Sequence, residues 1–158
     1  MIPLALALAV AMTIHAAAGA NEGATHGTRV ELPAAMPRKV SGMKIRINFE
    51  GKVITGTLAD TESARDFASM LPLTLTLKDY SGTEKISDLP RRLSTKGAPA
   101  GSDPSIGDLA YYAPWGNLAL FYKDFGYSSG LVTLGKLDSG VEVLSGRDPV
   151  KVTIELVK

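Results

Sequence analysis

The sequence predicts a mainly β fold for residues 43–158, a small closed eight-stranded β-barrel with one or two short helices. Three observations lead to this prediction. Short segments that alternate apolar and polar residues recur along the region, as half-buried strands do. Only one segment has the apolar spacing of a helix, and residues typical of turns separate the strands. A closed barrel is the simplest arrangement for seven or eight short strands, because closure leaves no unpaired strand edge.

The first half of the region contains three strands and the helix. The first strand alternates strictly, and a turn leads back into its hairpin partner. The helix has apolar residues at positions i, i+3, i+4 and i+7, and a proline ends it. In chain order the expected elements are a strand over 43–49, a turn over 50–52, a strand over 53–58, a helix capped by Asp60 or Thr61 that ends at Leu71, and a strand over 73–78.

The second half begins with a long loop and continues with strands. The loop has two glycines and two prolines and no periodicity. Two apolar segments then flank a Pro-Trp-Gly-Asn turn, and a hairpin turns at Asp-Ser-Gly. The expected elements are a loop over 95–105, strands over 109–113 and 118–123, a hairpin that pairs 131–137 with 141–144, and a last strand over 150–156.

The segment before the barrel predicts export. Residues 1–20 contain no charged side chain and eight alanines, with small residues suited to signal peptidase just before Asn21. The alternatives are a buried amino-terminal helix and a membrane anchor. Residues 21–42 have no aromatic residue and no apolar repeat, which indicates a flexible linker. We therefore expect a cleaved signal at 1–20, a periplasmic or extracellular monomer, and no membrane span after signal removal.

Composition excludes many functions for the barrel. The chain has no cysteine, and its histidines are His15 and His26, so cysteine nucleophiles, zinc–thiolate sites, Ser-His-Asp triads and histidine-ligated metals lack their essential groups. Fourteen basic side chains balance fourteen acidic ones within 43–158, which argues against a nucleic-acid partner. Glycine-rich phosphate loops are absent from the sequence. We expect no metal and no cofactor.

Carboxylates are the remaining candidates for acid–base chemistry. A pair of them could serve a glycosidase, if the two groups lay at the required spacing. Strand-end and turn acids that face water are the preferred interpretation. The acids concerned are Asp79, Glu84, Asp88, Asp103, Asp108 and Asp124.

An aromatic cluster is the strongest local indication of binding. Seven of the ten aromatic residues fall within 111–127. Neighbours on a strand face opposite sides, so one of each adjacent pair is available to a groove. Trp115, in its turn, is the best candidate for an exposed anchor. We predict a site that includes Tyr112, Trp115, Tyr122 and Tyr127; core packing of the aromatic residues is the alternative.

The region also resembles the bacterial cyclophilin-like domain family. The residues that carry the resemblance lie in the same order and spacing over most of 43–158. They are Met70-Leu71-Pro72-Leu73, Asp79-Tyr80-Ser81-Gly82-Thr83-Glu84-Lys85, Gly107-Asp108-Leu109-Ala110-Tyr111-Tyr112-Ala113-Pro114-Trp115-Gly116-Asn117, Leu120-Phe121-Tyr122-Lys123-Asp124 and Leu131-Val132-Thr133-Leu134-Gly135-Lys136-Leu137. The resemblance implies the eight-stranded barrel of the cyclophilins, which are peptidyl-prolyl isomerases.

The same resemblance implies that the isomerase machinery is missing. The strand that holds the catalytic arginine in cyclophilins corresponds to 73–80, which has no arginine. The Gln-Phe-Phe strand corresponds to Leu120-Phe121-Tyr122, and the pocket histidine to Leu131; Tyr127 lies near the position of the tryptophan. Leu120 therefore joins the expected ligand-binding residues. Arg91 and Arg92 are possible replacement electrophiles, although a solvated loop pair is the simpler interpretation.

We thus expect an exported barrel that binds a peptide or small ligand and has no catalytic residue. One alternative is a weak peptidyl-prolyl isomerase that uses Arg91 or Arg92. The other is a structural or accessory module of the cell envelope.

Overall fold

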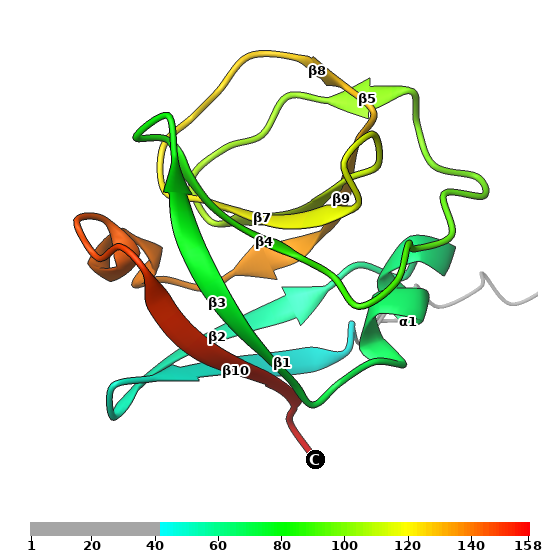
Figure 1. Ribbon diagram of the computed structural model, residues 1–158. Coiled ribbons are helices and arrows are strands. Elements are labelled where there is room, and N and C mark those ends of the chain that lie inside the picture. The colour runs from blue at the N-terminus through cyan, green and yellow to red at the C-terminus, as the bar shows by residue number, and fades with distance from the viewer. Residues whose placement is uncertain (1–41) are drawn as a thin grey trace, which may run out of the picture. The chain divides into compact units, whose positions relative to one another are not determined.

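A computed structural model describes residues 42–158, in which eight strands form a closed antiparallel barrel. The order around the barrel is β1-β10-β3-β4-β7-β6-β9-β2, and β5 and β8 form a separate two-stranded sheet (Figure 1). The predicted fold class is confirmed. The expected signal (1–20) and all but the last residue of the expected linker (21–42) lie outside the described residues. The strands are β1 Lys44–Phe49, β2 Lys52–Leu58, β3 Leu73–Tyr80, β4 Glu84–Asp88, β5 Gly101–Ser102, β6 Asp108–Tyr112, β7 Asn117–Phe121, β8 Ser128–Ser129, β9 Leu131–Leu137 and β10 Val150–Leu156.

Alternation along the strands fills the barrel interior. In β1, Ile45, Ile47 and Phe49 are buried, and the polar residues between them face outward. The same rule places Leu118 and Leu120 of β7 in the core. The core is one continuous cluster of aliphatic and aromatic side chains to which nearly every strand contributes.

The helix α1, Glu62–Ala68, begins where the sequence predicts and ends earlier. The Thr61 hydroxyl accepts a hydrogen bond from the Ala64 amide at 3.2 Å, as an N-cap residue does. Phe67 and its apolar neighbours on the same face are buried in the core. After Ala68 the chain tightens into three-residue turns, with Leu71 N–H donating to the Ala68 carbonyl at 3.1 Å.

The expected strand over 141–144 is wrong. These residues form a 3₁₀ helix, η1 Val141–Leu144, preceded by Gly140 at φ 84°. Both edges of β9 are already paired, with β2 and β6, so no edge remains for a hairpin partner. A 3₁₀ turn also directs Val141 and Leu144, three residues apart, toward the core together.

Strand β4 was not anticipated from the sequence. It contains Lys85 at a position that faces the barrel interior, which breaks the apolar alternation. The loop expected over 95–105 contains the short strand β5, which pairs with β8 above β7 in Figure 1.

Candidate functional site

A pocket of about 220 Å³ lies on the outer face of the barrel, over β4, β7, β6 and β9. We call it the outer pocket. Its floor is apolar and comes from Ile86, Phe121 and Leu131, which belong to a small cluster separate from the barrel core. Tyr80, Tyr112, Trp115 and Phe125 contribute its aromatic walls, and the other lining residues are Ser81, Thr83, Glu84, Asn117 and Ser128. The floor exists because every second residue of these strands points away from the barrel interior.

The aromatic wall is built around Trp115. Its indole makes edge-to-face contacts with Tyr80, at a ring-centre distance of 5.5 Å, and with Tyr112, at 5.2 Å. Such contacts are favoured by the ring quadrupoles. Trp115 is 55% exposed, so one side of the ring remains accessible. Gly116, at φ 79°, completes the turn that presents the indole, and its N–H donates to the Tyr112 carbonyl at 2.8 Å.

Two hydrogen-bond acceptors in the pocket, the Glu84 carboxylate and Asn117 Oδ1, have no donor among residues 42–158. The Glu84 carboxylate makes no hydrogen bond or ion pair with any of them, and partial burial raises its pKa to about 7. Asn117 is 3% exposed, and its side-chain oxygen Oδ1 accepts no hydrogen bond from this part of the chain. A buried acceptor without a donor, such as Asn117 Oδ1, is rare and costly, and an unpaired, partly buried carboxylate favours a cation beside it, so the two acceptors together indicate a ligand that donates hydrogen bonds.

Of the five residues expected to bind a ligand, Tyr112 and Trp115 lie together in the outer pocket, and the other three lie elsewhere. Leu120 is fully buried in the barrel core, because it alternates with the outward-facing Phe121. Tyr122 faces a second hollow and donates to Asp79 at 2.6 Å. Tyr127 is 59% exposed, and its ring lies against Gly101 of β5.

Tyr122 belongs to a polar cluster on the inward side of the same strands. The Lys85 ammonium is fully buried, lies 3.1 Å from the Asp79 carboxylate, and donates to the Arg147 carbonyl. Burial, followed by the hydrogen bond to Asp79, raises the pKa of Tyr122 to about 12. The Tyr122 hydroxyl is the main cause of a lowered Asp79 pKa. We call Asp79, Lys85 and Tyr122 the inner cluster.

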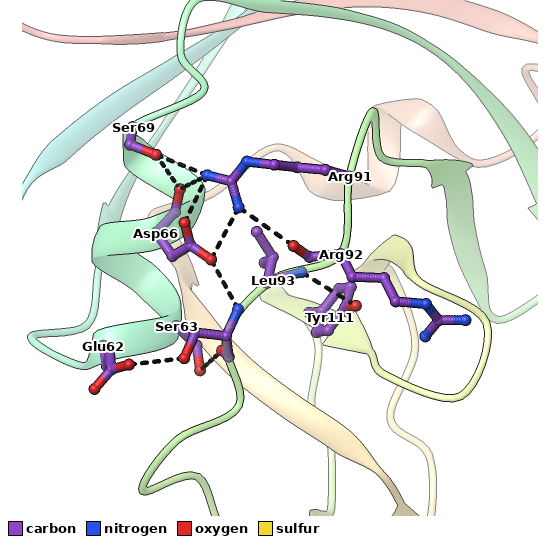
Figure 2. Close-up of polar contacts among 9 residues, drawn as sticks. Glu62, Ser63, Asp66, Ser69, Arg91, Arg92, Leu93 and Tyr111 are labelled. Carbon is purple, nitrogen blue, oxygen red and sulfur yellow. Dashed lines mark hydrogen bonds and ion pairs between the residues drawn. The ribbon is translucent and has the colours of Figure 1, made fainter.

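The two arginines proposed as electrophiles do not line the outer pocket. Figure 2 shows Arg91 directed toward α1, where its guanidinium bonds the Asp66 carboxylate at 2.6 and 3.0 Å and the Ser69 hydroxyl at 3.0 Å. The hydrogen bond from Arg91 is the main cause of a lowered Asp66 pKa. Arg92 extends away from these groups and donates to the Ala113 carbonyl at 2.7 Å. Both side chains thus anchor the 90–94 segment.

The sequence reasoning missed Tyr80, Glu84 and Asn117 as pocket residues. Glu84 was interpreted as a water-facing acid, whereas it is partly buried in the outer pocket. The sequence does contain a pattern that could have identified two of them. Tyr80 and Glu84 flank a Ser-Gly-Thr turn, so they pair across a hairpin and share one face of the sheet.

Residues 42–158 contain no group of three acidic or histidine side chains arranged to hold a metal ion. Within the same range, no helix is long and apolar enough to cross a membrane.

The comparisons with known proteins agree with the barrel. The Cyclophilin-like family matches residues 47–155, well over half of the chain. The chain belongs to the cyclophilin-like family. The solution structure of the hypothetical protein AF2241 from Archaeoglobus fulgidus is similar in fold, with a TM-score of 0.55 and 21% sequence identity over 77% of this chain and 100% of that one. No curated protein matches the sequence. The family and the neighbour establish the fold of this cyclophilin-like domain.

Proposed function

We propose that this cyclophilin-like domain is a binding module that holds a peptide or small ligand in the outer pocket without chemically changing it. One observation carries the proposal: an aromatic-walled pocket contains two hydrogen-bond acceptors that no residue of 42–158 satisfies. Apolar walls with a few placed polar groups are typical of ligand sites. The volume, about 220 Å³, is below the 300–1,000 Å³ common for drug-sized ligands and is suited to one side chain.

The lining of the pocket supports binding rather than isomerisation. Rotation about a peptide bond has a barrier of about 18–20 kcal/mol, because resonance stiffens the C–N bond. A catalyst lowers it by donating a hydrogen bond to the rotating amide, for which cyclophilins use an arginine. The residues that line the outer pocket include no arginine, lysine or histidine, and Arg91 and Arg92 bond to other groups.

A titration tests the binding function. Trp115 is the single tryptophan of the chain, so its fluorescence reports on this site alone. We expect short peptides, with and without proline, to shift that emission in a saturable way. Tyr112→Ala is expected to weaken binding about tenfold by removing one wall of the pocket. No saturable change with any peptide, by fluorescence or calorimetry, would contradict the proposed function.

A protease-coupled isomerisation assay separates the alternatives. Rates at background are expected for the binding module. Acceleration that disappears in Arg91→Ala or Arg92→Ala would instead favour a weak peptidyl-prolyl isomerase. A protein that neither binds nor isomerises would favour the accessory envelope module.

Export is part of the same proposal. It is supported by the uncharged apolar segment of residues 1–20 and by small residues before Asn21. The domain would then act in the periplasm or outside the cell, where peptides and small solutes are accessible to it.

A further inference from the structure

The outer pocket has two polar ends. Tyr80 and Glu84 pair across the β3–β4 hairpin and form one end. Tyr112 and Asn117 pair across β6 and β7 and form the other. Trp115 contacts both tyrosines, so its indole spans the distance between the ends.

Each end presents a hydrogen-bond acceptor that has no donor within residues 42–158. The lining residues include one acid, Glu84, and no basic side chain. Tyrosine and tryptophan rings present a negative face, which attracts a cation. A positively charged group is therefore suited to the Glu84 end, where it would meet the carboxylate and the ring of Tyr80.

The orientation of the Asn117 amide identifies the second requirement. Its Nδ2 points to the Leu118 carbonyl at 3.4 Å, which turns Oδ1 the other way. Oδ1 is the buried atom that lacks a donor within 42–158. A neutral N–H, such as a peptide amide, is sufficient at this end.

The separation of the two ends favours an elongated ligand. Glu84 pairs with Phe121, and Asp88 pairs with Asn117, so Glu84 and Asn117 are four residues apart along the strands. Their Cα positions are therefore about 13 Å apart along the strand direction, at about 3.3 Å per residue. A ligand that meets both side chains therefore carries two donors at the two ends of an elongated body. An extended lysine residue spans roughly 7 Å from its backbone nitrogen to Nζ, and its methylene stem matches the apolar floor of Ile86 and Phe121.

We propose, on the basis of the binding function above, that the outer pocket recognises a lysine side chain of a peptide. The ammonium lies against Glu84 and Tyr80, the aliphatic stem passes beneath Trp115 over the apolar floor, and the backbone N–H of that lysine donates to Asn117 Oδ1. The partner is thus an unmodified lysine in an extended, accessible segment of another protein.

The proposal makes binding dependent on pH. A proton on Glu84 removes its charge, so affinity for an ammonium falls as the pH drops below about 7. The other titratable groups near Glu84 are Tyr80 and the exposed Lys78 on β3, Tyr112 on β6, and Tyr122 after β7. Asp79 and Lys85 pair with each other on the inward side of the sheet.

Three peptides of one sequence, acetyl-Gly-Ser-Xaa-Ser-Gly-amide, test the proposal with the 158-residue chain. Xaa is lysine, norleucine or glutamate, and binding is followed by Trp115 fluorescence and calorimetry. At pH 8 we expect the lysine peptide to bind about 10- to 100-fold tighter than the norleucine peptide. We expect this preference to disappear in Glu84→Gln and at pH 5.5, and to persist in the matched control Asp60→Asn, whose carboxylate is exposed. Asn117→Leu is expected to weaken all three peptides by a similar factor.

The outcomes separate this proposal from the binding function. Equal or tighter binding of the norleucine peptide at pH 8, or a lysine preference that survives Glu84→Gln in a protein that melts normally, would overturn the lysine assignment and leave the binding function intact. If n-butylammonium chloride binds as tightly as the lysine peptide, recognition of the peptide backbone is overturned, because that probe lacks the backbone N–H. No detectable binding of any of these probes, by fluorescence or calorimetry, would overturn the binding function and the lysine assignment with it.

Discussion

The outer pocket and the inner cluster lie on opposite sides of the same strands, yet only the polar groups of the inner cluster are paired with one another. Asp79 and Tyr80 are consecutive, as are Glu84 and Lys85, so each pair contributes one residue to either side. On the inward side Asp79, Lys85 and Tyr122 bond to one another. On the outward side Glu84 has no partner within the described chain.

The difference distinguishes a polar group that stabilises a fold from one that is reserved for a ligand. A buried charge that is paired and hydrogen-bonded holds its neighbours in place. Removing its partner leaves an uncompensated charge in the interior, which destabilises the folded state. A buried acceptor without a donor opposes folding, and a donor supplied from outside recovers that cost. Mutations on the two sides should therefore have opposite effects on stability.

The largest effect is expected at the inner cluster. Asp79→Leu leaves the fully buried Lys85 ammonium without a counter-charge and should reduce the free energy of unfolding by about 2–4 kcal/mol. Urea denaturation at pH 7 measures the loss. Asp60→Asn is the control, since its exposed ion pair with Arg65 should contribute less than about 0.5 kcal/mol. A loss below 1 kcal/mol in Asp79→Leu would remove the structural role assigned to this cluster.

Glu84→Gln should have the opposite sign. The pKa of Glu84 is about 7 in the folded protein, against about 4.3 in an unfolded chain. The folded state therefore binds more protons between these values, and stability falls as the pH rises through them. Because the side chain is only partly buried, the expected effect is moderate. At pH 8 the free energy of unfolding of Glu84→Gln should exceed that of the parent by about 1–2 kcal/mol, and at pH 4 the two values should be equal. Urea denaturation at both pH values checks this, and identical curves at pH 8 would show that Glu84 is well solvated.

The smallest effect is expected at Asn117. Asn117→Leu removes an oxygen that has no donor within 42–158 and keeps a branched side chain of similar shape. We expect a change in unfolding free energy within about 1 kcal/mol, since replacing an unsatisfied polar group is close to neutral. Thermal denaturation gives the comparison. A much larger loss would mean that the Asn117 amide holds β7 in place.

Most of the barrel could be predicted because its strands carry a period-2 pattern. The last strand, 150–156, and the strand over 131–137 match the structure residue for residue. The pattern failed at β4, where Lys85 occupies a core position, and at 141–144, where the edges of β9 were already paired. Both failures depend on contacts between segments distant in sequence, which local alternation does not contain.

The site was predictable in part for the same reason. Trp115 and Tyr112 follow from the aromatic cluster and from alternation. Tyr122 was expected in the site, and the structure places it on the inward side because the preceding residue, Phe121, faces outward. Glu84 and Asn117 carry no unusual pattern of their own, and only the three-dimensional pairing of β3, β4, β6 and β7 places them in one pocket.

Closure of the barrel also bears on how the protein behaves at high concentration. Each of the eight barrel strands has a hydrogen-bonded neighbour on both flanks, so none is an edge strand along its whole length. The other two strands of residues 42–158, β5 and β8, are only two residues long. Fibril growth by strand addition would therefore need the barrel to open first, which ties resistance to aggregation directly to the stability of the fold.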